Sequence, residues 1–330
     1  MRIFDTHAHY DSRQFDEDRD QLLREIHNEI RAEACAEQKG ISVKVPVKRI
    51  VNVGADMASS QTTLELSHKY DYIFAAVGVH PDSAGELIWC PEKCAKYENE
   101  IIDASAIKDN EENLGQEIGN ADDSDTEDPY KDITEEICNR NRELLKNLAQ
   151  QKKVVAIGEI GLDYHWDIWP RDIQKKAFEW QWKLAEELKL PVIIHSRDAA
   201  EDTLNMIRGF YETKRNTGVL QKAVMHCYSY SPEHAEEYLK MGLMFGIGGV
   251  VTFKNAKKLK EVVDLLPLDK ILLETDCPYM APDPFRGKRN NSGYLTYVAE
   301  KIAEIKGVDV KTVYDRTWDN AEEFFDLSKV

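Results

Sequence analysis

Eight short apolar runs alternate with longer amphipathic segments, and this alternation limits the possible folds more than any other feature of the chain. Segments such as residues 173–188 carry apolar and charged side chains at the spacing of an α-helix. Short buried strands separated by helices form parallel sheets. We therefore predict an α/β protein, a single-domain (β/α)8 TIM barrel, with an open doubly wound sheet as the alternative. The apolar runs are residues 2–4, 49–53, 73–79, 154–157, 192–194, 223–225, 243–247 and 271–273.

A histidine or a carboxylate stands at the C-terminal end of six of these eight runs. In a barrel these ends meet on one face, where active sites are built from separate strands. If each of these residues were only a buried polar side chain, their shared placement would be a coincidence. The residues are His7, His9, His80, Glu159, His195, His226 and Asp276.

The first of these ends reads "FDTHAHYD" and carries two histidines one residue apart. In an extended strand, residues i and i+2 point to the same side, so His7 and His9 would project together toward one ion. Taken alone, the pair is equally typical of surface histidines, or of histidines satisfied by Asp5 and Asp11.

Four histidines and two carboxylates exceed what one ion needs. Imidazole and carboxylate suit zinc, manganese, iron or, with more oxygen and water, magnesium. Two ions about 3.5–4 Å apart and bridged by a carboxylate would use the whole set, and would supply a metal-bound hydroxide. Asp276 could then hold one ion and also accept the proton of the water, as a general base. The predicted metal ligands are His7, His9, Glu159, His195, His226 and Asp276.

Basic residues near these ends fit a substrate that carries phosphate. Arg197 follows His195 by two residues, "RGKRN" after the last run contains Arg286 and Lys288, and Lys254 lies in "TFKNAKK". Arginine binds phosphate through its planar fork and lysine as a point charge. The alternative interpretation of these cations is a solvated loop.

The net charge of -17 argues against a general nucleic-acid coat protein, which needs a basic surface. It does not exclude a nuclease, in which metal ions and local cations meet the phosphates. We find no apolar run of about 18 residues and no signal peptide, and therefore expect a cytoplasmic protein without a membrane partner. The cysteines are scattered, and the Cys90/Cys94 spacing has no second pair to complete a zinc site.

Residues 108–131, "KDNEENLGQEIGNADDSDTEDPYK", are acidic and nearly free of large apolar side chains. We predict that they form a mobile insertion after the third strand. The acidic run 122–125 lacks the glycine and terminal glutamate of an EF-hand, which argues against a calcium site.

Seven motifs bring a family into view. "DTHAHYD", "VGVHP", "IGEIGLDY", "PVIIHSRDA", "MHCYS", "GGVVTFKNA" and "ETDCPYMAP" occur in the order found in the TatD family of metal-dependent deoxyribonucleases. The resemblance covers nearly the whole chain apart from the acidic insertion. Two departures are the insertion itself and Ser292-Gly293, where the family more often has a glutamate-proline step.

The resemblance implies a barrel related to the amidohydrolases, with a site for two divalent ions. One ion would be held by His7, His9, Glu159 and Asp276. Glu159 would bridge to the second ion, which His195 and His226 would complete. His80 matches the "GVHP" stretch and would approach the substrate without binding metal.

The resemblance also implies a magnesium-dependent DNase with 3′-to-5′ exonuclease action. We therefore expect two divalent ions (Mg²⁺, Mn²⁺ or Zn²⁺), DNA as substrate, no obligate protein partner and a monomer. Hydrolysis of a carbonyl substrate (an amide, lactone or aminoacyl ester) remains the alternative, because the same hydroxide can attack carbon. A barrel that binds metal without catalysis is the third hypothesis.

Overall fold

The computed structural model describes residues 1–28, 45–90, 133–214 and 221–327. Within these ranges eight parallel strands form one sheet whose spatial order follows the sequence from β1 to β8. The predicted strands are confirmed: two have the predicted bounds, three differ slightly, and β1, β4 and β5 extend further toward their C-terminal ends. The strands are β1 (Ile3–Ala8), β2 (Val47–Val53), β3 (Ile73–Val77), β4 (Val154–Asp163), β5 (Val192–Arg197), β6 (Ala223–Met225), β7 (Met244–Ile247) and β8 (Ile271–Leu273).

The first and last strands meet and close the sheet. Ala8 and Cys277 form a parallel bridge just beyond β8. The N–H of His9 donates to the carbonyl of Cys277 at 2.8 Å, and the N–H of Asp276 donates to the carbonyl of His7 at 2.9 Å. The fold is therefore a (β/α)8 barrel, and the alternative of an open doubly wound sheet is wrong.

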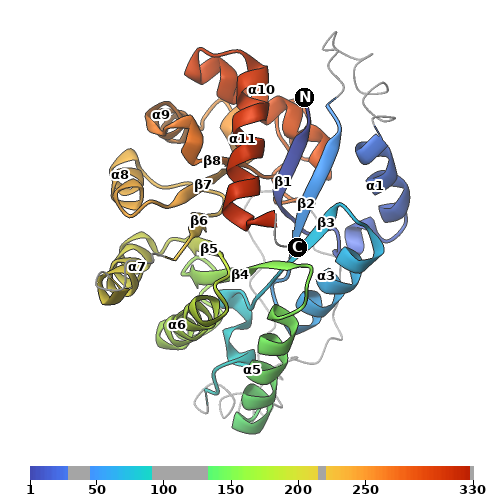
Figure 1. The fold of residues 1–330 in the computed structure, drawn as a ribbon. Helices are drawn as coiled ribbons and strands as arrows, with labels where there is room; N and C mark the ends of the chain where they lie inside the picture. Colours follow the sequence, from blue (N-terminus) through green and yellow to red (C-terminus); the bar gives the residue numbers. More distant parts are fainter. Residues whose placement is uncertain (29–44, 91–132, 215–220, 328–330) are drawn as a thin grey trace, which may run out of the picture.

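Helices surround the strands in the alternating order expected for this fold (Figure 1). The amphipathic segment predicted at 173–188 is α6 (Arg171–Leu188). The other α-helices are α1 (Arg19–Asn28), α3 (Met57–Lys69), α5 (Glu135–Ala149), α7 (Ala200–Lys214), α8 (Pro232–Lys240), α9 (Lys257–Leu265), α10 (Leu295–Lys306) and α11 (Val310–Phe325). The short 3-10 helices are η1 (Arg13–Phe15), η2 (Pro81–Glu86), η3 (Gly249–Thr252), η4 (Leu268–Lys270) and η5 (Ser292–Tyr294).

Helix α11 lies across the N-terminal end of the barrel (Figure 1). Its Trp318 packs on Phe4 of β1 with ring centroids 5.7 Å apart, and Arg49 of β2 forms an ion pair with Glu322. Trp318, Phe324 and Phe325 of α11 join the apolar residues that fill the barrel interior in one cluster. This end is therefore a packed core, and the opposite end carries the polar residues.

Three strands extend further than the sequence indicated, so several polar residues lie inside strands rather than after them. His7 belongs to β1, His195 belongs to β5, and β4 continues through Glu159 to Asp163. The pairing of β4 with β5 changes register between Ile157 and Ile160. Within this irregular stretch, the N–H of Glu159 donates to the carbonyl of Gly54, the residue after β2, at 2.9 Å. The prediction that Glu159 ends its strand is therefore wrong in detail, although its side chain still reaches the C-terminal end of the barrel.

The acidic insertion predicted at 108–131 lies outside the described residues, and so does Cys94. Within the described ranges, none of the helices combines the length and the apolar character that crossing a membrane requires.

Candidate metal centre

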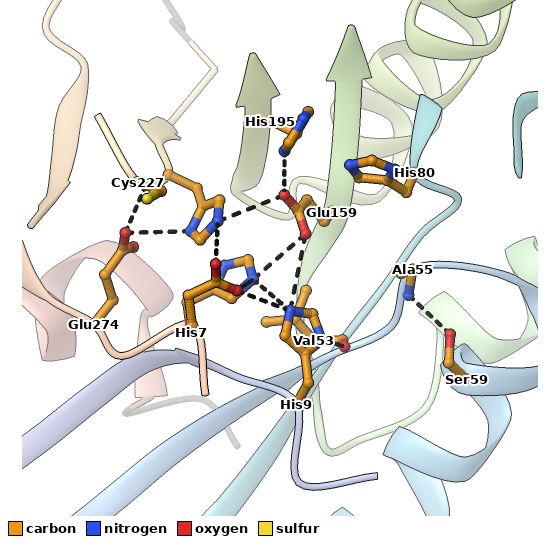
Figure 2. A network of polar contacts seen from close by, with 12 residues as sticks. His7, His9, Val53, Ala55, Ser59, His80, Glu159, His195, Cys227 and Glu274 are labelled. Atoms are coloured by element: carbon orange, nitrogen blue, oxygen red, sulfur yellow. Dashed lines mark hydrogen bonds and ion pairs between the residues drawn. The ribbon is translucent and has the colours of Figure 1, made fainter. Parts of the chain in front are cut away.

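The six predicted metal ligands meet at the C-terminal end of the barrel. β1 and the residue after it supply His7 and His9, β4 supplies Glu159 and β5 supplies His195. His226 directly follows β6, and Asp276 follows β8. Figure 2 shows the resulting network of polar contacts.

His7, His9 and Asp276 form the first group. The Nε2 atoms of His7 and His9 are 3.1 Å apart, and Oδ1 of Asp276 lies 3.4 Å from Nε2 of His9 and 4.0 Å from Nε2 of His7. Nδ1 of His9 lies 2.8 Å from the carbonyl oxygen of Val53. That backbone contact fixes the ring and leaves Nε2 directed at the cluster, as the i, i+2 spacing predicted.

Glu159 lies between this group and the two remaining histidines. Its Oε2 is 3.5 Å from Nε2 of His7. Its Oε1 is 2.8 Å from Nδ1 of His195 and 3.6 Å from Nε2 of His226. One carboxylate thus faces ligand atoms from three other strands.

Two carboxylates that the sequence reasoning did not single out hold the outer nitrogens of these histidines. Oδ2 of Asp163 lies 2.9 Å from Nε2 of His195, and Oε1 of Glu274 lies 3.2 Å from Nδ1 of His226. Each ring therefore turns its other nitrogen toward Glu159. Carboxylates that fix the tautomer and orientation of a ligating histidine are common around protein metal ions. Asp163 in "GLDY" and Glu274 in "ETD" stand inside motifs, which is the signal that could have found them.

Glu274 fits against the one position on β7 that leaves room for it. A Cβ atom at Gly246 would lie 2.0 Å from Oε2 of Glu274. The Oε1 atom also accepts the N–H of Cys227 at 2.6 Å. Glu274 is 1% exposed, so its position depends on these contacts.

The two carboxylates of the cluster stay ionised despite burial. Burial raises the pKa of Glu159, but His226, His195 and His7 outweigh it and hold this pKa well below its usual value. Burial likewise raises the pKa of Asp276, and the hydrogen bond from His9 and the charge of His226 reverse the shift.

Three histidines respond in the opposite direction. Burial lowers the pKa of each ring, but nearby carboxylates raise the pKa to about 9 for His9 and His195 and to about 10 for His226. Asp276 is the main cause at His9, Asp163 at His195 and Glu274 at His226. The anionic cluster thus attracts positive charge, which a divalent cation would supply.

The donor set fits such a cation. Ligand atoms of His7, His9 and Asp276 all lie within 4.8 Å of one another, and so do those of His7, Glu159 and His226. Imidazole nitrogen and carboxylate oxygen are suitable ligands for zinc, manganese or iron, and magnesium is compatible when water completes its shell. These five residues could therefore hold metal, with His195 adjoining Glu159.

The four predicted phosphate-binding cations are exposed at the C-terminal face of the barrel, where one is the last residue of β5 and the other three lie in the loops that follow β7 and β8. Arg286 lies with its guanidinium 4.6 Å from the ring centroid of Phe253. By contrast, Arg289 forms an ion pair with Asp18 at 2.6 Å, which ties that part of the loop to the barrel. The exposed cations are Arg197, Lys254, Arg286 and Lys288.

His80 is the N-cap residue of η2 and packs edge-on against His195, with ring centroids 4.2 Å apart. Burial and the neighbouring His195 lower the pKa of His80 to about 3. The ring is therefore neutral at pH 7 and lies beside the cluster.

Ser292, where the family more often has another residue, stabilises the loop after β8 through hydrogen bonds. Its hydroxyl donates to Oδ2 of buried Asp5 at 2.6 Å, and the hydroxyl of Thr275 donates to the same oxygen at 2.6 Å. Oδ1 of Asp5 accepts the N–H of His7 at 3.2 Å. Asp5 thus joins β1, which leads to His7 and His9, to the loop after β8, which carries Asp276.

A parallel barrel with a histidine–carboxylate cluster at its C-terminal strand ends defines a metal-dependent hydrolase. The chain belongs to the TatD-related DNase family, whose model matches residues 4–326. It is 38% identical to the uncharacterized metal-dependent hydrolase YabD of Bacillus subtilis, over 99% of this chain and 100% of YabD. It is 36% identical to the 3′-5′ ssDNA/RNA exonuclease TatD of a Rahnella species, over 56% of this chain and 70% of that protein.

Solved structures share the fold. The TatD homologue YjjV of Escherichia coli aligns with a TM-score of 0.70 and 24% identity, over 98% of both chains. An uncharacterized amidohydrolase of Saccharomyces cerevisiae aligns with a TM-score of 0.69 and 19% identity, over 98% of this chain and 99% of that one.

Proposed function

We propose that the protein is a metal-dependent phosphodiesterase that degrades DNA from its 3′ end and uses two divalent ions. Membership of the TatD-related DNase family supports the class of reaction. The Rahnella relative, named a 3′-5′ ssDNA/RNA exonuclease, supports the substrate and the polarity.

The observation that carries the proposal is the position of Glu159. Its two oxygens face different sets of ligand atoms, with Oε2 toward His7 and Oε1 toward His195 and His226. A carboxylate placed in this way can bridge two ions. When bound, such ions lower the pKa of a water molecule and stabilise the charge on a reacting phosphoryl group.

In this proposal different residues of the chain bind metal, accept a proton and orient the ligands. His7, His9 and Asp276 would hold one ion together with Glu159, and His195 and His226 would complete the second. Asp276 also receives the proton of the attacking water on its carboxylate, which is ionised in the structure. Asp163 and Glu274 keep the outer nitrogens of His195 and His226 protonated, so that the inner nitrogens are free to bind.

Exposed cations at the C-terminal face of the barrel favour a phosphodiester over a neutral carbonyl substrate. Arg197, two residues after His195, and Arg286, in the loop after β8, are exposed, and guanidinium groups match phosphate oxygens in pairs. Because the net charge of the chain is -17, long-range attraction contributes little and these local cations must position the strand.

The test is digestion of end-labelled single- and double-stranded DNA by the metal-stripped protein, with each divalent ion added back separately. We expect nucleotides to be released one at a time from the 3′ end, with activity restored by Mg²⁺ or Mn²⁺. Hydrolysis of ester, lactone or amide panels without any action on DNA would favour a carbonyl substrate instead. Absence of turnover with every ion would favour a non-catalytic metal-binding barrel.

A further inference from the structure

The two most exposed large hydrophobic side chains among the described residues both belong to loops next to the candidate metal centre. Trp166, in the loop between β4 and α6, is 58% exposed, and Tyr279, in the loop after β8, is 54% exposed. Leaving an aromatic ring in water gives up the favourable burial of its apolar surface, so two such rings at one site point to a ligand that covers them.

The loop that carries Trp166 is anchored to a candidate metal ligand through one side chain. Oδ1 of Asp163 accepts the N–H of His165 at 2.9 Å and the N–H of Trp166 at 3.0 Å. Oδ2 of the same carboxylate lies 2.9 Å from Nε2 of His195. The backbone at Trp166 is therefore held next to the cluster.

A cation and a second ring accompany the indole. The guanidinium of Arg197 lies 5.6 Å from the ring centroid of Trp166, and the two neighbouring strands pair Arg197 with Asp163. The ring of His165 meets the indole edge-on, with centroids 5.0 Å apart. An apolar face and an exposed positive charge thus stand together.

Tyr279 is anchored in the same manner at another strand end. Its N–H donates to the carbonyl of the candidate ligand Asp276 at 2.9 Å, and its own carbonyl accepts the side-chain amide of Asn290 at 2.7 Å. β4 and β8 stand four positions apart in a closed ring of eight strands, on opposite sides of the barrel. The loops that carry the two aromatic rings therefore leave the barrel on opposite sides of the cluster.

We propose that Trp166 and Tyr279 stack on nucleobases on either side of the bond to be cleaved, with Arg197 contacting a phosphate beside Trp166. Aromatic side chains and a positive groove are what single-stranded nucleic acid binds, because every base offers a π-face. A base must leave its pair to stack on protein, so the substrate is single-stranded at the site. This inference rests on the proposed function.

The test compares an intact single-stranded oligonucleotide with one in which the two 3′-terminal bases are replaced by abasic residues. Binding is measured in chelator by anisotropy of a 5′ label, and KM is measured with metal. Trp166→Ala and Tyr279→Ala should each weaken binding of the intact strand, by about 5- to 150-fold. The abasic strand should bind weakly to the unaltered protein and equally weakly to the variants.

Conservative variants separate stacking from folding. Trp166→Phe and Tyr279→Phe keep a ring and should retain most of the affinity, with unchanged melting temperatures. Ile168→Ala removes a 41% exposed apolar side chain from the same loop and should change nothing.

Two results would overturn the inference: alanine variants that bind the intact strand as well as the unaltered protein, or that lose the intact and abasic strands equally. A protein that neither binds nor cleaves any oligonucleotide, yet hydrolyses a carbonyl substrate, would overturn the proposed function itself.

Discussion

Oε1 of Glu274 lies 3.2 Å from Nδ1 of His226 and accepts the backbone N–H of Cys227 at 2.6 Å. One buried oxygen therefore sets both the ring orientation and the backbone of the segment that follows β6. The carboxylate occupies space that exists because β7 has no side chain at Gly246. Glu274 thus positions a candidate metal ligand without approaching the substrate.

Glu274→Ala should weaken metal binding by about 10- to 100-fold, because His226 loses the partner that holds its orientation. Glu274→Gln keeps an acceptor oxygen and should lose less. Calorimetric titration of the metal-stripped protein measures both. Gly246→Ala should lower the affinity as well, since the new Cβ would lie 2.0 Å from Oε2. Gly209→Ala, whose Cβ meets nothing within 4 Å, is the control. Unchanged affinity in Glu274→Ala would show that the carboxylate does not act on the metal site.

Glu159→Ala should lower the content of both ions, because this carboxylate faces His7 on one side and His195 and His226 on the other. We expect fewer than two ions per chain by elemental analysis, loss of hydrolysis, and a far-ultraviolet circular dichroism spectrum like that of the unaltered protein. Two tightly bound ions in a folded variant would be incompatible with a bridging role.

Asp276→Asn should reduce the rate far more than the metal content. Asparagine keeps an oxygen that can bind metal but cannot accept the proton of water. General base catalysis contributes about 10²- to 10⁴-fold, and kcat should fall within this range. Single-turnover rates at saturating metal, measured with metal content on the same sample, provide the check. A near-normal kcat would rule out Asp276 as the base.

The double variant Arg286→Ala/Lys288→Ala should raise KM for oligonucleotides and largely spare a small, singly charged phosphodiester. The dependence of binding on salt should become shallower, since fewer counterions are released when fewer phosphates are contacted. Lys311→Ala/Arg316→Ala removes the same charge from α11, at the opposite end of the barrel, and serves as the control. Equal losses on both substrates would mean that the loop supports the metal site instead.

Glu86→Gln should make the metal-free protein more stable at pH 8 relative to the unaltered chain. Burial raises the pKa of Glu86 from 4.5 to about 7, although the N–H of Met57 donates to its Oε2 at 2.8 Å. The folded state binds this proton more tightly than the unfolded state, so the resulting stabilisation is complete below about pH 4.5 and is lost as the pH rises through 7. Glutamine does not ionise. Urea unfolding should show that the free energy of unfolding of the variant, relative to that of the unaltered chain, is higher at pH 8 than at pH 5. The same difference at both pH values would argue against a raised pKa of Glu86.

The strands and the cluster at their ends were predictable because buried strands appear as apolar runs and their polar ends stand out. The contacts that those polar residues make could not be predicted from the sequence. The apolar run ended at residue 157, yet β4 continues to Asp163. It passes through Gly161, where φ is 147° and a Cβ atom would lie 1.9 Å from the carbonyl oxygen of His195, so this position requires glycine. Asp163 and Glu274 stand in the motifs "GLDY" and "ETD", but the motifs do not say what these carboxylates contact. Only the closed barrel shows that they face the rings of His195 and His226.

Asp163 gives the site a property that neither of its partners has alone. One carboxylate holds the outer nitrogen of His195 and the backbone of the Trp166 loop, so each constrains the other. If an ion bound at His195 raises the affinity of Trp166 for a nucleobase, thermodynamic linkage requires that the nucleobase raise the affinity for the ion by the same factor. Substrate would then recruit its own cofactor, and the enzyme would be most fully loaded with metal where nucleic acid is present.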